Sequence, residues 1–216
     1  MITITTIILI LTCVISFSAF SNEKIMNDLI FYPPAITHQN QWYRFITCGL
    51  IHADIAHLGF NMYSFYMFGD YIESTFTEIF GAKGKVLFIV LYVSSLFICL
   101  LPTYFNNKEN YYYKSLGASG AVSAIVFAFI FLAPTQKIGL MFIPIHFPAF
   151  IFGAVYLAIT AYLSKKGGSH INHSAHFWGA IYGIVFLIVT CQFLSDARPL
   201  ENFILQIKYF LEQLFS

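Results

Sequence analysis

Six long apolar segments divide this chain, and they constrain its fold more than any other feature of the sequence. They lie at about residues 2–20, 54–72, 84–102, 119–132, 146–163 and 174–194. Most of them approach the roughly 20 residues that a helix needs to cross a hydrocarbon layer about 30 Å thick. Because a helix satisfies its backbone hydrogen bonds within one segment, it is the usual solution in lipid. The segments therefore predict an all-α polytopic membrane protein with a bundle of six transmembrane helices.

The composition agrees with a membrane protein. Hydrophobic residues make up 58% of the 216 positions and charged residues only 10%, whereas charged residues are about 25% of an ordinary soluble domain. The net charge of +1 gives no basis for binding nucleic acid. The four cysteines are scattered without a CxxC spacing, so we interpret them as packing residues. No metal and no cofactor are expected.

Two regions of different character are predicted, a membrane domain over residues 1–196 and a tail over residues 197–216. The first apolar segment lacks the basic start of a secretory signal and is longer than the apolar core of one, so we expect it to be retained. The tail has apolar residues on one helical face and charged residues off it. This pattern predicts an amphipathic helix lying on the membrane surface in contact with lipid. Its apolar face comprises Phe203, Ile204, Ile207, Phe210, Leu211 and Leu214.

Three polar residues, His57, Ser119 and His176, stand at or near the starts of the second, fourth and sixth segments. Basic residues are divided almost evenly among the loops and so do not orient the chain. Successive spans nevertheless alternate in direction, so these three starts face the same side of the bilayer. The fourth segment is short, which places Ser119 roughly 10 Å below the near surface if the helix reaches the far one. The three side chains are therefore predicted to meet at one depth.

Small residues on two segments predict a close helix contact. Gly120, Ala124 and Ala128 form a stripe along the fourth segment, and Gly179 and Gly183 form a GxxxG spacing in the sixth. Such faces let helices approach without intervening side chains. Gly117 and Gly120 also flank Ser119, where glycine lets a backbone or substrate come near. Docking of these faces would bring His176 to Ser119.

The chemistry available to these residues is acyl transfer. A serine hydroxyl becomes a good nucleophile when a base within about 3 Å takes its proton, and His176 is the candidate base for Ser119. His57, Asn61 and the backbone N–H of Ser119 at a helix N-terminus are candidate donors to the oxyanion. No acidic third member stands nearby in the sequence, so a Ser119/His176 dyad is predicted.

Other interpretations remain open for each residue. A serine in a Gly/Ala-rich helix is often a packing residue, and His57 with Asn61 can form hydrogen bonds between helices. His176 can also be a proton-relay or pore residue. A channel or transporter would be expected to have a paired inverted repeat, and we find no convincing one. Together, the residues in this order and on one side favour an enzyme.

The ordered set resembles the rhomboid family of intramembrane serine proteases, over about residues 41–194. The elements that carry the resemblance are Trp42-Tyr43-Arg44, the run from His57 to Asn61, Gly117-Ala118-Ser119-Gly120, and Ala175-His176 followed by Gly179 and Gly183. The resemblance implies a six-helix rhomboid-like bundle, a Ser119/His176 dyad and an oxyanion site of His57, Asn61 and the Ser119 amide. It also implies that the partners are transmembrane protein substrates and that the protein lies in a membrane, expected to be the bacterial cytoplasmic membrane.

One position departs from the family pattern. Family members often have an aromatic residue one turn after the serine that stacks on the catalytic histidine, whereas this chain has Ser123. Ser123, Phe177 and Tyr182 are the local candidates for orienting His176. His52 and His173 are given at most a water-organising role.

The alternative function is that of an inactive relative that binds or escorts membrane clients, but such relatives typically lose the serine or the histidine, and this chain has both.

Overall fold

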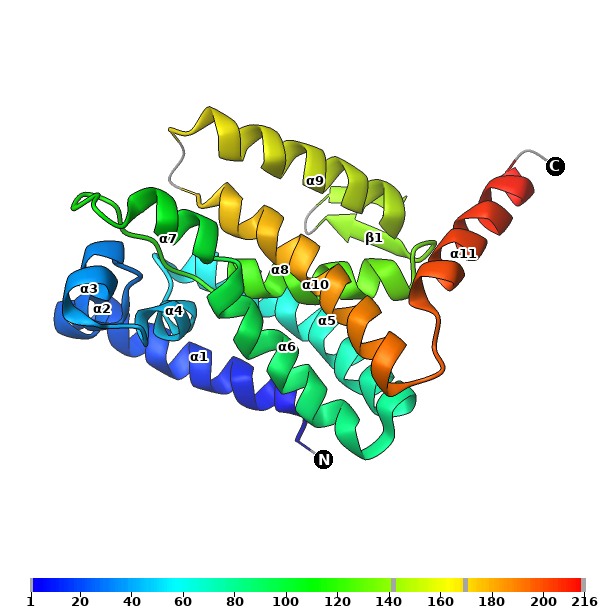
Figure 1. The fold of residues 1–216 in the computed structure, drawn as a ribbon, viewed down its shortest axis with the longest axis horizontal. Coiled ribbons are helices and arrows are strands. Elements are labelled where there is room, and N and C mark those ends of the chain that lie inside the picture. Colours follow the sequence, from blue (N-terminus) through cyan, green and yellow to red (C-terminus); the bar gives the residue numbers. More distant parts are fainter. Residues whose placement is uncertain (1, 141–142, 169–170, 215–216) are drawn as a thin grey trace.

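The computed structural model describes residues 2–140, 143–168 and 171–214, and most of them are helical (Figure 1). Each of the six apolar segments coincides with a helix. These are α1 (Ile4–Phe20), α5 (Ile55–Phe80), α6 (Gly84–Ile98), α8 (Ser119–Leu132), α9 (Ala149–Lys166) and α10 (His173–Leu194). By length and composition, the helical run Ile55–Asn107 and α10 can cross a membrane, whereas α1 and α8 are apolar but shorter. The number of spans therefore remains a prediction.

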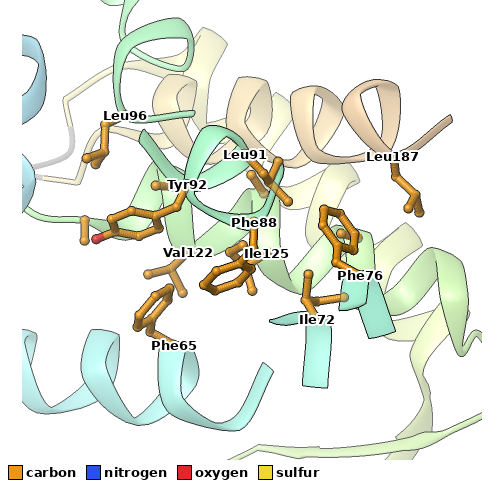
Figure 2. Close-up of a cluster of buried hydrophobic side chains, with 14 of the residues drawn as sticks. Phe65, Ile72, Phe76, Phe88, Leu91, Tyr92, Leu96, Val122, Ile125 and Leu187 are labelled. Atoms are coloured by element: carbon orange, nitrogen blue, oxygen red, sulfur yellow. The ribbon is translucent and has the colours of Figure 1, made fainter. Parts of the chain in front are cut away.

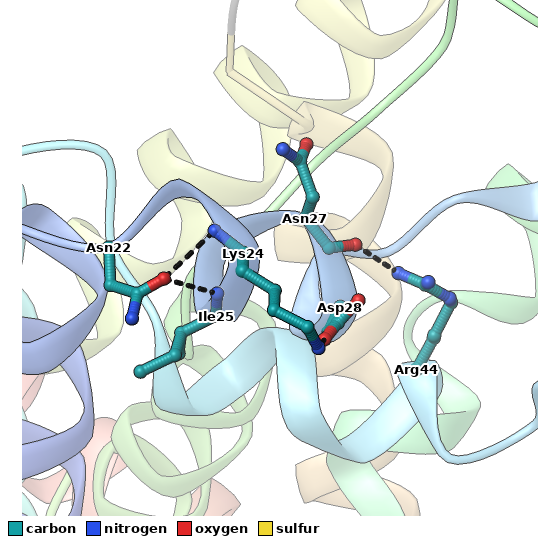
Figure 3. A network of polar contacts seen from close by, with 6 residues as sticks. All are labelled: Asn22, Lys24, Ile25, Asn27, Asp28 and Arg44. Atoms are coloured by element: carbon teal, nitrogen blue, oxygen red, sulfur yellow. Dashed lines mark hydrogen bonds and ion pairs between the residues drawn. The ribbon is translucent and has the colours of Figure 1, made fainter.

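Short helices fill the connections. The loop between α1 and α5 contains α2 (Glu23–Leu29), α3 (Pro33–Gln39), α4 (Arg44–Thr47) and the 3₁₀ turn η1 (Cys48–Leu50), while η2 (Gly81–Lys83) and α7 (Leu101–Asn107) flank α6. Buried Arg44 donates to the carbonyls of Asn27 (2.8 Å) and Ile30 (2.7 Å) at the end of α2. Figure 3 shows the Asn27 contact beside the exposed Lys24–Asp28 ion pair. Since carbonyls at a helix end lack partners within the helix, Arg44 stabilises the end of α2.

An antiparallel pair of strands, β1 (Lys137–Leu140) and β2 (Ile143–Pro148), precedes α9. It is the exception to the all-α prediction, and the fifth segment, expected to begin at residue 146, becomes helical only at Ala149. Pro148 is the N-cap of α9, with φ −53° and ψ 137°. The reason is local, because proline has no amide to donate and biases the residue before it toward extended backbone.

The core of the bundle surrounds α8, which has ten buried residues among its 14 and packs against α5, α6 and α10. The exposed sides of α5 and α6 leave large apolar side chains on the surface, as expected for helices that contact lipid. Figure 2 shows part of the main apolar cluster, which includes Phe65, Phe88, Leu91, Ile125 and Leu187. Because α8 is buried on most sides, the residue at its start, Ser119, is held in a defined position.

The backbones of α8 and α10 lie in direct contact. A Cβ added to Gly179 would lie 2.0 Å from the carbonyl oxygen of Gly120, and one added to Gly183 would lie 2.1 Å from that of Ala124. No side chain larger than hydrogen fits at either position without displacing a helix. This contact sets the register of α10 on α8 and places the start of one helix beside the start of the other.

The C-terminal helix α11 (Pro199–Leu214) forms where an amphipathic helix was predicted, and in Figure 1 it extends away from the bundle. Phe203 stacks on Phe131 of α8 with ring centroids 4.4 Å apart, and Phe210 contacts Phe150 of α9 at 5.9 Å. Other apolar side chains of α11, such as Ile204, remain exposed. Its contact with lipid stays a prediction.

A buried carboxylate joins α1 to α5. Glu73 is 4% exposed, and its two oxygens accept hydrogen bonds from the backbone N–H groups of Ile4 (2.9 Å) and Thr5 (2.8 Å). The Thr5 hydroxyl donates to the same carboxylate at 3.0 Å. Amides at a helix N-terminus lack partners within the helix and favour negative charge, so Glu73 satisfies the start of α1.

Glu73→Gln is therefore expected to destabilise the fold by about 2–3 kcal/mol, because an amide NH₂ would replace one of two anionic acceptors in a buried place. Thermal unfolding in detergent measures the change. Glu78→Gln is the matched control, since Glu78 lies on the same helix but is exposed. Equal unfolding temperatures for the two variants would show that Glu73 does not anchor α1.

Candidate active site

Ser119 is the first residue of α8 and is partly accessible. The turn before it depends on Gly117, whose φ of 107° lies in the region that favours glycine. The Gly117 N–H donates to the carbonyl of Cys48 at 2.9 Å, which ties this turn to η1. As a first-turn residue, Ser119 has a backbone N–H with no acceptor within its own helix. The serine thus presents both a hydroxyl and an amide donor.

His176 lies in the first turn of α10. The helix begins after Asn172, whose side-chain oxygen accepts from the Ala175 N–H and from the Thr103 hydroxyl of α7, both at 3.1 Å. The His176 Nε2 atom is 2.6 Å from Ser119 Oγ. With a neutral imidazole that carries its proton on Nδ1, the serine hydroxyl donates to Nε2. Along the described ranges, no carboxylate forms a hydrogen bond with His176.

His57 and Asn61 lie on the first two turns of α5, where Asp54 caps the helix by accepting from the His57 N–H at 2.7 Å. The buried Asn61 side chain donates from Nδ2 to the His57 carbonyl at 3.0 Å. A Cβ added to Gly117 would lie 2.8 Å from Cε1 and 2.9 Å from Nε2 of His57. The imidazole therefore packs directly against the turn that leads to Ser119.

The tautomer of His57 follows from its other nitrogen. The Ala53 N–H points to Nδ1 at 3.5 Å, so Nδ1 is the acceptor and the proton is on Nε2. This N–H faces the Gly117 side of the turn. Ser119, His176 and His57 are thus brought to one end of the bundle, and Asn61 stands one turn below His57.

His52 is fully buried and connects α1 to the same turn. The Ser16 hydroxyl donates to the Leu50 carbonyl (2.9 Å), so its oxygen accepts from His52 Nδ1 at 3.0 Å. His52 Nε2 then accepts from the Ala118 N–H at 3.5 Å. Burial, together with the nearby His57, lowers the pKa of His52 to about 3, although Asp54 opposes the shift. A neutral His52 thus holds the residue before Ser119, a contact that the sequence did not predict.

The contacts of His176 identify a neighbour that sequence reasoning missed. The ring of Tyr156 in α9 lies nearly parallel to the imidazole, at 14° and 6.4 Å between centroids. Of the three residues predicted to orient His176, Phe177 instead packs on Trp178, and the Tyr182 hydroxyl contacts Ser94 at 2.7 Å. Ser123 contacts the Tyr156 hydroxyl. No spacing within α10 or α8 points to a residue in α9, so only the packing could identify Tyr156.

A polar cavity of about 260 Å³ lies beside the start of α10. Its lining includes Thr103 and Asn107 of α7 together with Asn172 and His173. His173 Nδ1 and Asn172 Nδ2 are buried and have no hydrogen-bond partner among the residues that the structure describes. A polar space of this size can hold water, and the His173 ring contacts that of His176 at 6.0 Å between centroids.

The family model for the Rhomboid domain matches residues 39–193. The chain is 26% identical over 184 residues to Rhomboid protease GlpG of Haemophilus influenzae, an alignment that covers 84% of this chain and 88% of that protein. It is 32% identical over 146 residues to RHOMBOID-like protein 12, mitochondrial, of Arabidopsis thaliana, covering 62% of this chain and 42% of the relative.

A third relative is the Presenilin-associated rhomboid-like protein, mitochondrial, of Rattus norvegicus. It is 28% identical over 140 residues, which cover 63% of this chain and 35% of the relative. The chain therefore spans less than half the length of these two mitochondrial proteins. The family match, in contrast, includes the residues from the Trp42 element to α10.

Proposed function

This chain belongs to the rhomboid family, and on that basis we propose that it is an intramembrane serine endopeptidase that cleaves transmembrane segments of other membrane proteins. The observation that carries the proposal is the 2.6 Å contact between Ser119 Oγ and His176 Nε2. The two residues stand 57 positions apart in the sequence. A serine and a neutral imidazole in this geometry are the minimum set for nucleophilic catalysis.

In the proposed mechanism His176 Nε2 takes the proton of Ser119 as Oγ attacks the scissile carbonyl carbon. The protonated imidazole then gives that proton to the leaving amine, and water hydrolyses the acyl-enzyme with His176 again as the base. The polar cavity beside Asn172 and His173 supports a supply of this water. Since the same pair acts in both acylation and hydrolysis of the acyl-enzyme, the proposed reaction needs no cofactor.

The oxyanion of each tetrahedral intermediate needs donors on the side of Ser119 that faces α5. We propose the Ser119 N–H, the free hydrogen of Asn61 Nδ2 and the Nε2–H of His57 for this role. The tautomer of His57 and the first-turn position of Ser119 support it. Each such donor is typically worth about 3–4 kcal/mol in the transition state.

Substrates are proposed to be helices that unwind easily. A scissile carbonyl inside a helix is hydrogen-bonded and shielded, and opening a helix in lipid leaves backbone groups unpaired at several kcal/mol each. Segments with glycine, proline or small residues near the cleavage point lower that cost. The protein is accordingly proposed to be a multi-pass component of the bacterial cytoplasmic membrane with membrane proteins as its partners.

Reaction with a fluorophosphonate probe in detergent tests the proposal. Ser119 Oγ would form a bond to phosphorus, fluoride would leave, and His176 would take the hydroxyl proton. Mass spectrometry of the labelled chain is expected to find the modification on Ser119, and a reporter transmembrane segment in liposomes is expected to be cut. A folded chain that neither reacts nor cleaves would favour the client-binding alternative.

A further inference from the structure

The imidazole of His176 can act on Ser119 only if its rotation is restricted. His176 lies in the first turn of α10, where the helix backbone fixes Cβ but leaves the ring free to turn about its side-chain torsions. A rotated ring would point Nε2 away from Ser119 Oγ. A neighbour that covers the face of the ring is therefore needed, and in this chain the residue one turn after the serine is too small to provide it.

Tyr156 provides such a face. Its ring lies nearly parallel to that of His176, and it also packs against Phe127 of α8, with centroids 5.4 Å apart. Tyr156 is partly buried in this position. A flat ring held against an imidazole excludes the rotations that would bring an edge of the imidazole into it.

The hydroxyl of Tyr156 fixes the ring in turn. The Ser123 hydroxyl donates to the Ser119 carbonyl at 2.9 Å, so its oxygen accepts from the Tyr156 O–H at 2.7 Å. The same tyrosine therefore contacts His176 directly and is linked to Ser119 through Ser123. Its ring touches the base, and its hydroxyl is bound to the helix turn that begins with the nucleophile.

The helix that carries Tyr156 is peripheral. In Figure 1, α9 lies along the outer edge of the bundle, and only Ala149, Gly153 and Thr160 of its residues are buried. Gly153, one turn before Tyr156, packs closely on α8, since a Cβ there would lie 3.3 Å from Ile130. The aromatic face on His176 therefore belongs to a helix on the outside of the bundle.

We propose that Tyr156 is a positioning residue for His176, so that the catalytic geometry depends on a helix that carries neither member of the dyad. The inference rests on the proposed function. It assigns to α9 the part of the site that keeps Nε2 directed at Ser119.

The test compares the rate of fluorophosphonate labelling for Tyr156→Phe, Tyr156→Leu and Tyr156→Met. The phenylalanine variant keeps the aromatic face and is expected to stay within about threefold of the wild type. The leucine and methionine variants lose it and are expected to react on the order of a hundredfold more slowly, the cost of a misplaced catalytic group. For cleavage of the reporter segment, kcat is expected to fall with KM unchanged within about threefold, because the binding surface is retained.

Tyr162→Leu is the matched control, because Tyr162 lies on the same helix and is 64% exposed. Unfolding temperatures in detergent identify the variants that fold, and the methionine variant replaces the leucine variant if the latter does not. Wild-type labelling in a folded Tyr156→Leu or Tyr156→Met chain would overturn the inference. So would a phenylalanine variant as slow as the aliphatic ones, which would assign the effect to the hydroxyl. A wild type that does not react contradicts instead the proposed function.

Discussion

Ser119→Ala and His176→Ala are each expected to lower the cleavage of a transmembrane reporter by at least about 10⁴-fold, and the double variant is expected to be no slower than either single one. The two residues act as one unit through the hydrogen bond between Oγ and Nε2. Removing the nucleophile leaves the base without a function, and removing the base leaves the hydroxyl protonated. Losses of this kind are strongly non-additive.

All three variants should remain folded, because each replaces a side chain at the start of a helix and leaves the contact between α8 and α10 intact. Cleavage in liposomes gives the activity, and thermal unfolding in detergent gives the fold. Ser74→Ala, a serine on the exposed side of α5, is the matched control. Full activity in a folded Ser119→Ala chain would refute the proposed protease function. Client binding or transport would then be the functions to consider.

Asn61→Ala should differ from the dyad variants in the same assay. It removes one of several proposed oxyanion donors, so turnover is expected to fall only on the order of a hundredfold. The Nδ2 group of Asn61 also holds the His57 carbonyl, so a small loss of stability should accompany the change. A loss as complete as that of Ser119→Ala would place Asn61 among the essential residues.

Gly183→Ala is expected to cause a large structural effect for a single added methyl group. The new Cβ would lie 2.1 Å from the Ala124 carbonyl oxygen, which belongs to a backbone and cannot move aside as a flexible side chain can. The two helices must separate, at a cost of about 3 kcal/mol or more. Because α10 carries His176, a shift of about 1 Å should also slow Ser119 labelling on the order of a hundredfold.

Gly59→Ala separates this effect from helix propensity. Gly59 lies inside α5, and an added Cβ would meet no atom within 4 Å. Alanine there gains up to about 1 kcal/mol of helix propensity, so the variant should unfold at the same or a higher temperature and keep its activity. The prediction for Gly183 would be wrong if its alanine variant matched Gly59→Ala in both unfolding temperature and labelling rate.

The sequence by itself determined where the long apolar helices form. Apolar composition and segment length are local properties, and they located all six long helices before any packing was known. The glycines at 179 and 183 indicated which face of α10 would meet α8, since only small residues allow that approach. The residue types and chain order also named Ser119 and His176 as candidates. Each of these inferences uses residues that are close in sequence or lie on one helical face.

The tertiary structure decided what holds those candidates in place. Tyr156 reaches His176 from a different helix, Ser16 reaches His52 across 36 positions, and the Glu73 carboxylate reaches Thr5 across 68. The strand pair before α9 likewise needs pairing between β1 and β2, which apolar periodicity does not encode. In each case the packing of the folded chain brings together residues that are distant in the sequence. A pattern along one segment does not encode such a contact.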